Sequence, residues 1–132
     1  MKKYMLVLFV AVLLLAQIAC SLGRGVPGKR FTNQTTSRSS SHFTDKTEVV
    51  EIVDEVNEGM RYINLDMDFD LKTGSISWKL IDPKEAIRLE GEAVAGEQIR
   101  EQHNFDVIPG EWKLVLDIQE ASGGYEINWE AR

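Results

Sequence analysis

Three aspartates at alternate positions are the residues of this sequence whose spacing most suggests chemistry. Asp66, Asp68 and Asp70 stand in the stretch NLDMDFDLKTG. On a β-strand every second side chain points to the same side, so the three carboxylates would form a column with neighbours about 6–7 Å apart. Calcium takes about six to eight oxygen ligands, many of them carboxylates. Two of these aspartates and a partner from the next strand could therefore bind it.

The column also has a plainer interpretation. Its D-x-D-x-D spacing begins like a helix-loop-helix calcium motif, but Leu71 stands where that motif needs glycine, and Ser77 where it needs glutamate. Charged residues on strands by default form a solvated outer face. Tyr62 and Asn64 fall on the same side of the strand and extend this face. We therefore predict a polar strand face, with a calcium site or a ligand-binding surface as the functional alternatives.

Residues suited to catalysis are few. The two histidines, His42 and His103, lack metal-ligand spacing, and no Gly-x-Ser-x-Gly turn is present. His103 shares a side of its strand with Phe105 and Val107, as a structural histidine would. Carboxylates are abundant, but no pair stands out as acid and base. The chain is therefore not expected to be an enzyme, and a glycosidase-like activity through unidentified carboxylates is the alternative.

The first residues have the organisation of an export signal. Two lysines precede an apolar run that ends at Leu15, and small residues lead to Cys20. The run is shorter than the roughly 20 residues of a membrane span, which favours a removed signal peptide, residues 1–19, over an uncleaved anchor. Cys20 is the only cysteine, so no intrachain disulfide can form.

The stretch LAQIAC resembles the lipobox of bacterial lipoproteins, in which the cysteine receives a diacylglycerol and becomes the mature N-terminus. Ala19 fits this pattern, whereas Gln17 stands where an aliphatic residue is usual. That departure leaves conventional cleavage after ACS open. The resemblance implies a membrane anchor at Cys20 and a place in the bacterial cell envelope. Ser21 implies sorting to the outer membrane if the cell has one.

Charge and composition divide the rest of the chain. Residues 20–47 begin with the lipidated cysteine and are rich in Ser, Thr and Gly without an apolar period, which predicts a flexible tether with a net charge of +4. Residues 48–132 carry 20 acidic and 8 basic residues, a net charge of −12. A domain this acidic is repelled from nucleic acid, which excludes that class of partner.

Apolar residues between positions 48 and 132 recur with the two-residue period of β-strands. Trp78, Trp112 and Trp129 all fall on the apolar sides and are expected in the core. Gly91 lies inside one predicted strand and indicates a bulge. About seven strands separated by turn signals predict an all-β fold, a small antiparallel β-sandwich. The predicted strands are residues 48–56, 61–71, 75–81, 86–94, 98–108, 112–118 and 125–132.

The segments GSISWKLIDP and IPGEWKLVLDIQEASGGYEINW resemble bacterial pre-peptidase C-terminal domains and the jelly-roll P domain. The resemblance covers residues 60–130, although Lys84 and Glu85 stand where the family often has glycine. It implies an accessory or binding module outside the cytoplasm, without catalysis of its own. We therefore expect an envelope-anchored lipoprotein whose sandwich is a non-catalytic binding or structural module, with a protein or a glycan as partner and a calcium-stabilised module as the main alternative.

Overall fold

Five antiparallel strands make up residues 34–132, the part of the chain that the computed structural model describes. The predicted signal peptide and Cys20 lie outside the described residues. Within residues 34–132 no helix is long and apolar enough to cross a membrane. The strands are β1 (Thr35–Val56), β2 (Tyr62–Ile81), β3 (Ile87–Val94), β4 (Gln98–Asp106) and β5 (Gly110–Ala131).

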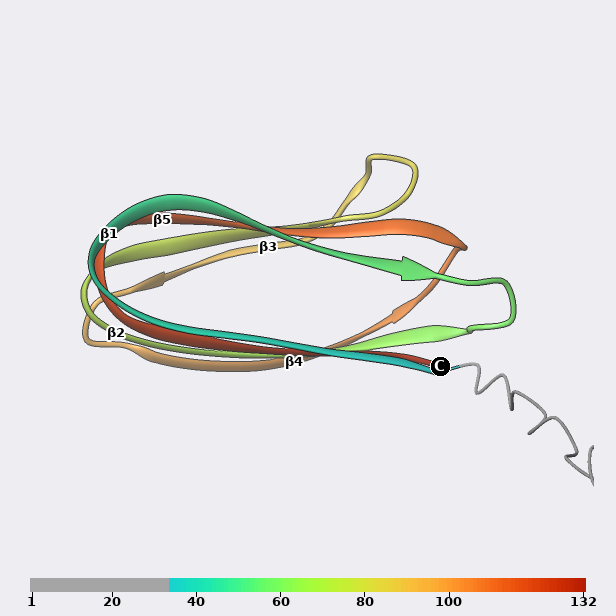
Figure 1. The fold of residues 1–132 in the computed structure, drawn as a ribbon, viewed down its shortest axis with the longest axis horizontal. Coiled ribbons are helices and arrows are strands. Elements are labelled where there is room, and N and C mark those ends of the chain that lie inside the picture. The colour runs from blue at the N-terminus through green and yellow to red at the C-terminus, as the bar shows by residue number, and fades with distance from the viewer. Residues whose placement is uncertain (1–33) are drawn as a thin grey trace, which may run out of the picture. The chain divides into compact units, whose positions relative to one another are not determined.

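Three of these strands bend and so belong to two layers (Figure 1). β1, β2 and β5 are 20 to 22 residues long, and each contributes one half to each layer. β3 and β4 each belong to one layer only, so the layer that contains β3 is called the β3 layer and the layer that contains β4 the β4 layer. The predicted all-β antiparallel sandwich is confirmed. In the β4 layer, residues 35–43, 123–131, 62–71 and 98–106 lie side by side in that order, and in the β3 layer residues 48–56, 110–118, 75–81 and 87–94.

The prediction of a flexible tether up to residue 47 is wrong for residues 35–47. They form the first half of β1, which pairs with β5 from its first residue. The inward positions there are the small, half-buried Ser37, Ser39 and Ser41, so the segment has no apolar period for sequence analysis to detect. Backbone pairing with β5 orders it instead. The sandwich domain therefore begins before residue 48.

Two of the predicted turns are corners inside continuous strands. The KTG segment lies at a register shift in β2, and the EASGG segment lies in the matching part of β5. Gly74 and Gly123 have φ values of 73° and 142°, which favour glycine. At both corners the strand crosses from one layer to the other. Seven of the eight strand segments match the predicted strands, and the eighth is residues 35–43.

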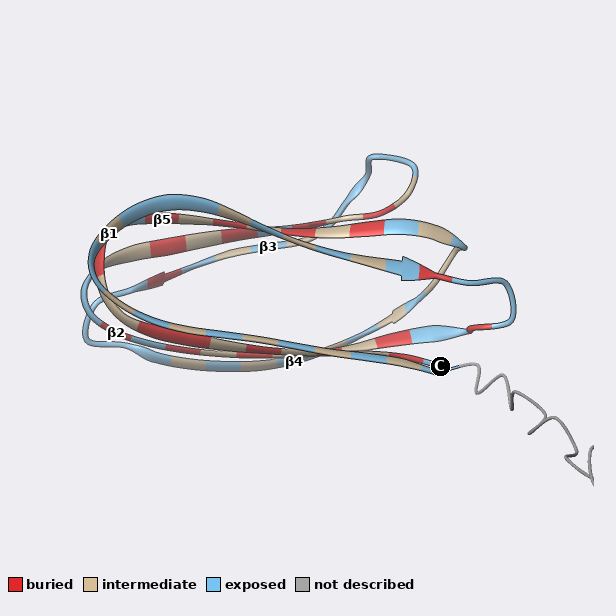
Figure 2. Ribbon diagram, viewed as in Figure 1, coloured by how far each residue is buried: buried red, intermediate tan, exposed pale blue. Residues whose placement is uncertain are grey.

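The core forms between the layers as the alternation predicts (Figure 2). The ring of Phe69 in the β4 layer stacks on Trp78 in the β3 layer, with ring centroids 4.7 Å apart. This contact joins the two halves of β2 across the interior. The three tryptophans are buried as expected. The inward residues of the first half of β2 are all buried: Ile63, Leu65, Met67, Phe69 and Leu71.

Gly91 does not mark a bulge, contrary to the prediction. It pairs with Trp78 in regular register, and the nearest irregularity lies between Leu80 and Ile81. A Cβ atom at position 91 would overlap the indole ring of Trp78. The glycine is therefore needed for the packing of a large ring against the neighbouring strand.

Asp82 holds the turn that the DPKE sequence predicts between β2 and β3. Its Oδ1 accepts hydrogen bonds from the backbone amides of Lys84 (2.8 Å) and Ala86 (3.0 Å), and its Oδ2 accepts one from Arg88 Nη1 (3.2 Å). Burial raises the pKa of Asp82, but the hydrogen bonds from Ala86, Lys84 and Arg88 together outweigh burial. The pKa of this carboxyl therefore lies below its ordinary value.

We expect Asp82 to stabilise the fold at neutral pH and to lose that effect in acid. Because its pKa is lower in the folded state, the contribution is complete above the unfolded pKa of about 3.9 and is lost as the pH falls through the folded pKa. Asp82→Asn removes the charge and keeps one acceptor. Urea denaturation from about pH 7 to about pH 2.5 should show a shrinking difference in unfolding free energy between wild type and variant. A difference that stays constant over this range would contradict the assignment.

Candidate functional site

The predicted aspartate column lies on the outer face of the β4 layer. The residues of β2 between the aspartates are buried, and Asp66, Asp68 and Asp70 point away from the core. Tyr62 and Asn64 share this side, as expected. The register places one residue of β4 and one of β5 beside each aspartate: Gln102 and Asn128 beside Asp66, Arg100 and Glu126 beside Asp68, and Gln98 and Gly124 beside Asp70.

Asp68 forms an ion pair with Arg100 of β4. The Arg100 guanidinium donates to Asp68 Oδ2 from Nε (2.9 Å) and from Nη2 (2.5 Å). The arginine side chain of this ion pair is exposed to solvent, so the pair contributes little to the stability of the fold. It does fix the guanidinium across the middle of the column and compensates the central negative charge.

Glu126 on β5 is held as a carboxylate by two neighbours. Asn128 Nδ2 donates to its Oε1 at 3.1 Å, and Arg38 Nη2 lies 2.8 Å from its Oε2. The hydrogen bond from Asn128, followed by that from Arg38, lowers the pKa of Glu126 against the opposing effect of burial. A general acid of a glycosidase needs a raised pKa, so Glu126 is unsuited to that role.

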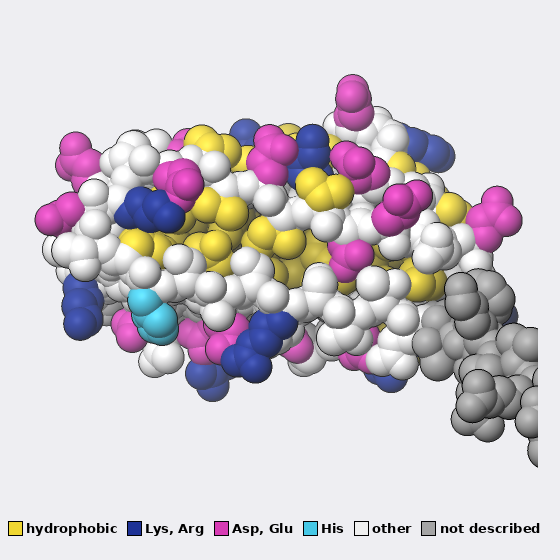
Figure 3. Space-filling view, viewed as in Figure 1, with side chains coloured by type: hydrophobic (Ala, Val, Ile, Leu, Met, Phe, Trp, Pro, Cys, Tyr) yellow, Lys and Arg dark blue, Asp and Glu magenta, His cyan; other side chains and the backbone are white. Residues whose placement is uncertain are grey.

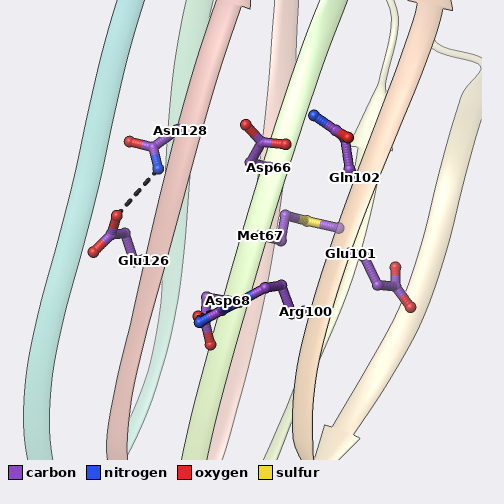
Figure 4. Close-up of a pocket in the computed structure, with 8 residues that line it drawn as sticks. All are labelled: Asp66, Met67, Asp68, Arg100, Glu101, Gln102, Glu126 and Asn128. Carbon is purple, nitrogen blue, oxygen red and sulfur yellow. Dashed lines mark hydrogen bonds and ion pairs between the residues drawn. The ribbon is translucent and has the colours of Figure 1, made fainter.

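The outward side chains of β2, β4 and β5 around Asp68 line a shallow groove, called here the polar groove (Figure 4). Its first section has a volume of about 340 Å³. A second section of about 260 Å³ shares Asp68 and Glu126 with the first and continues along β2 and β5 to His42 and Asp70. The residues of the first section are Asp66, Met67, Asp68, Arg100, Glu101, Gln102, Glu126 and Asn128.

Gly124 creates the floor of the second section. The His42 ring lies where a Cβ atom at position 124 would stand. Register places His42 of β1 and Asp70 of β2 on either side of this glycine. The second section therefore runs past the ion-paired residues to the His42 ring, which packs over the backbone of Gly124.

The groove offers many hydrogen-bonding groups of both kinds. Arg100 and the amides of Gln102 and Asn128 can donate, while Asp66 and the amide oxygens can accept. Neighbouring strands lie about 4.8 Å apart, so these groups form rows with that spacing. Such an arrangement suits an extended ligand that both donates and accepts along its length.

The calcium alternative gains no support from the geometry. In residues 34–132 no group of three or more His, Cys, Asp or Glu side chains could hold a metal ion. Asp66, Asp68 and Asp70 are spread along the strand, and Arg100 already pairs with the middle one. His103 makes its contact with Glu101 at 2.8 Å and stacks on Phe105, with ring centroids 6.0 Å apart, which is the structural role predicted for it.

The residues that complete the groove could not be recognised from the sequence pattern alone. Gln102 and Arg100 alternate on β4, and Glu126 and Asn128 alternate on β5, so the two-residue period could have placed each pair on an outer face. It could not show that β4 and β5 both flank β2. Arg38 was missed because it lies in the segment predicted as a tether.

Comparison with known proteins returns similarity only among solved structures. No protein family matches the chain, and no curated protein matches it. A protein of the disulfide-linked pili of Bacillus endospore appendages aligns with a TM-score of 0.48 at 9% identity, over 75% of this chain and 86% of its own. TmCBM61 in complex with beta-1,4-galactotriose aligns with a TM-score of 0.45 at 15% identity, over 77% and 89%. The pre-peptidase C-terminal domain of collagenase from Bacillus anthracis aligns with a TM-score of 0.43 at 20% identity, over 73% and 88%.

Proposed function

We propose that this protein is an exported lipoprotein whose β-sandwich binds glycan chains in the polar groove without chemical conversion. The observation that carries the proposal is the groove itself, an open surface where hydrogen-bond donors and acceptors from three strands lie side by side. Sugar hydroxyls both donate and accept, so they can satisfy such a surface along an extended chain. The groove is shallow and open, which suits polymer binding more than enclosure of a small substrate.

A glycan fits this groove better than a protein partner does. The centres of protein interfaces are rich in aromatic and apolar residues and poor in charge, whereas carboxylates, amides and arginine dominate the groove. Tyr62 ends the aspartate row with 37% of its surface exposed, and the Arg132 guanidinium lies 5.2 Å from its ring centroid. This ring lies on the same side of β2 as the aspartates, beyond Asn64, and gives a sugar one aromatic edge to contact.

Electrophoresis through gels that contain neutral soluble polysaccharides tests the groove. We expect at least one polysaccharide to retard the wild-type protein, and Asp66→Ala/Gln102→Ala to weaken binding by about tenfold, since each lost hydrogen bond is worth about 0.5–1.5 kcal/mol. Lys79→Ala/Glu90→Ala is the matched control, because this cross-strand pair lies on the outer face of the β3 layer. Equal weakening by both double variants, or no retardation by any polysaccharide, would contradict the proposal.

Membrane attachment through Cys20 is the second part of the proposal. We expect the wild-type protein in the membrane fraction and Cys20→Ser in the soluble exported fraction, because the serine cannot carry the thioether-linked lipid. Conventional cleavage would instead release both forms. An uncleaved anchor would leave both forms in the membrane at the mass of the precursor. If the cell has an outer membrane, Ser21 predicts that the wild-type protein fractionates with it.

A further inference from the structure

The free side of β1 is the longest exposed edge of the described sandwich. β1 has 22 residues and lies at the end of the strand order, where it pairs with β5 alone. Its other side presents unpaired backbone N–H and C=O groups to solvent. Such an edge can pair with a further strand unless its side chains prevent this.

The second half of β1, residues 48–56, carries exposed apolar side chains. Val49 and Val53 are 59% and 50% exposed on the outer side, and both are β-branched. Val50 and Ile52 point inward and are only partly buried against the core. Figure 3 shows a band of hydrophobic side chains between the two layers, on the side of the molecule where β1 lies.

Small side chains on the first half of β1 leave this band open. Ser37, Ser39 and Ser41 point inward there and pair with Trp129, Ile127 and Tyr125 of β5. Hydroxyl groups of this size cover little of the neighbouring apolar surface. Asp54 bridges the two halves of β1 by accepting a hydrogen bond from Ser37 Oγ (3.0 Å). The seam between the halves is thus apolar apart from the Ser37–Asp54 contact, and it is accessible from the edge (Figure 3).

The charge of residues 48–56 decides which kind of strand can pair there. Glu48, Glu51, Asp54 and Glu55 are all acidic, and the segment contains no lysine or arginine. Lys46 pairs with Glu48, and Lys113 Nζ lies 3.8 Å from Glu51 Oε2, so these two neighbours compensate only part of the charge. Antiparallel pairing with a second copy of the same edge would bring these carboxylates together, which is unfavourable. A basic segment would instead be attracted.

We propose that residues 48–56 of β1 form a docking edge for an extended peptide segment in which basic and β-branched residues alternate. The segment adds as a further strand to the β3 layer. Its apolar side chains cover Val50, Ile52 and the seam, and its basic side chains lie beside Glu51 and Glu55. This edge is separate from the polar groove, which lies on the outer face of the β4 layer.

The probe for this proposal is a fluorescent nonapeptide of alternating Lys and Val with both ends blocked, titrated by anisotropy into the full chain in detergent. We expect Glu51→Lys/Glu55→Lys to weaken its binding at least tenfold. Glu90→Lys/Glu92→Lys makes the same charge change on β3, at the opposite edge of the same layer, and should alter binding by less than twofold. Absence of binding to the wild type, or equal weakening by both double variants, would overturn the proposal.

N-methylation of the peptide separates strand addition from simple charge attraction. One peptide carries N-methyl groups on every valine and the other on every lysine. In an added strand, alternate N–H groups face β1, so we expect one methylated peptide to lose binding and the other to keep it. Retention of binding by both peptides would overturn strand addition.

Discussion

Gly123→Ala is expected to lower the free energy of unfolding by about 2–5 kcal/mol. Gly123 has a φ of 142° at the corner where β5 crosses between the layers. An alanine with positive φ costs about 1–2 kcal/mol. Its Cβ would also overlap the carbonyl oxygen of Asp70 and approach the Cα of Leu71, both in the backbone of β2. Overpacking against atoms that cannot rotate away adds about 1–3 kcal/mol, which urea denaturation can measure.

Gly96→Ala is the matched control for this corner. Gly96 also has positive φ, 86°, but no heavy atom lies within 4 Å of the position its Cβ would take. The loss of stability there should be limited to the backbone cost of about 1–2 kcal/mol. If the two variants lose the same stability, the close approach of β2 and β5 at the corner does not constrain position 123.

Deleting residues 35–47 is expected to have an effect of similar or larger size. The fragment 48–132 begins where sequence analysis places the domain, but it lacks the strand that pairs with the second half of β5. That deletion removes Phe43, whose ring lies 6.2 Å from Tyr125, and uncovers part of Ile127 and Trp129. Each large buried side chain contributes about 1.5–3 kcal/mol when fully buried, so we expect a loss of at least about 3 kcal/mol.

Comparison of fragments 34–132 and 48–132 by near-ultraviolet circular dichroism and urea denaturation tests this expectation. The longer fragment should unfold cooperatively. The shorter one should lose part of its tertiary signal and bind a hydrophobic dye, because β5 becomes an exposed edge. Equal stability of the two fragments would show that residues 35–47 are dispensable and that the original domain boundary at residue 48 is adequate.

The sequence predicts the core better than it predicts the connections. Alternation of apolar and polar residues placed Leu65, Met67 and Phe69 inside and Asp66 and Asp68 outside, because burial on one side of a strand leaves a direct mark on composition. Corners leave a weaker mark. A segment that contains glycine has the same composition whether it ends a strand in a hairpin or bends the strand as it crosses between layers. KTG and EASGG were therefore both predicted as turns.

The first half of β1 shows what alternation cannot detect. Ser37, Ser39 and Ser41 occupy inward positions where apolar residues would be expected, so composition alone suggests disorder there. Prediction of the groove from sequence is limited in the same way. Asp66 could be assigned to an outer face from sequence, but its neighbours Gln102 and Asn128 depend on the order of strands, which local patterns do not encode.

Two-dimensional NMR of the full chain during titration with a polysaccharide-derived oligosaccharide tests the central claim most directly. We expect the amide signals of Asp66, Gln102 and Asn128 to shift together in a saturable way, while the oligosaccharide keeps its length. Shifts confined to the outer face of the β3 layer, around Lys79 and Glu90, would contradict the polar groove as the binding site. Shortening of the oligosaccharide during the titration, absent with Asp66→Ala, would contradict binding without chemical conversion.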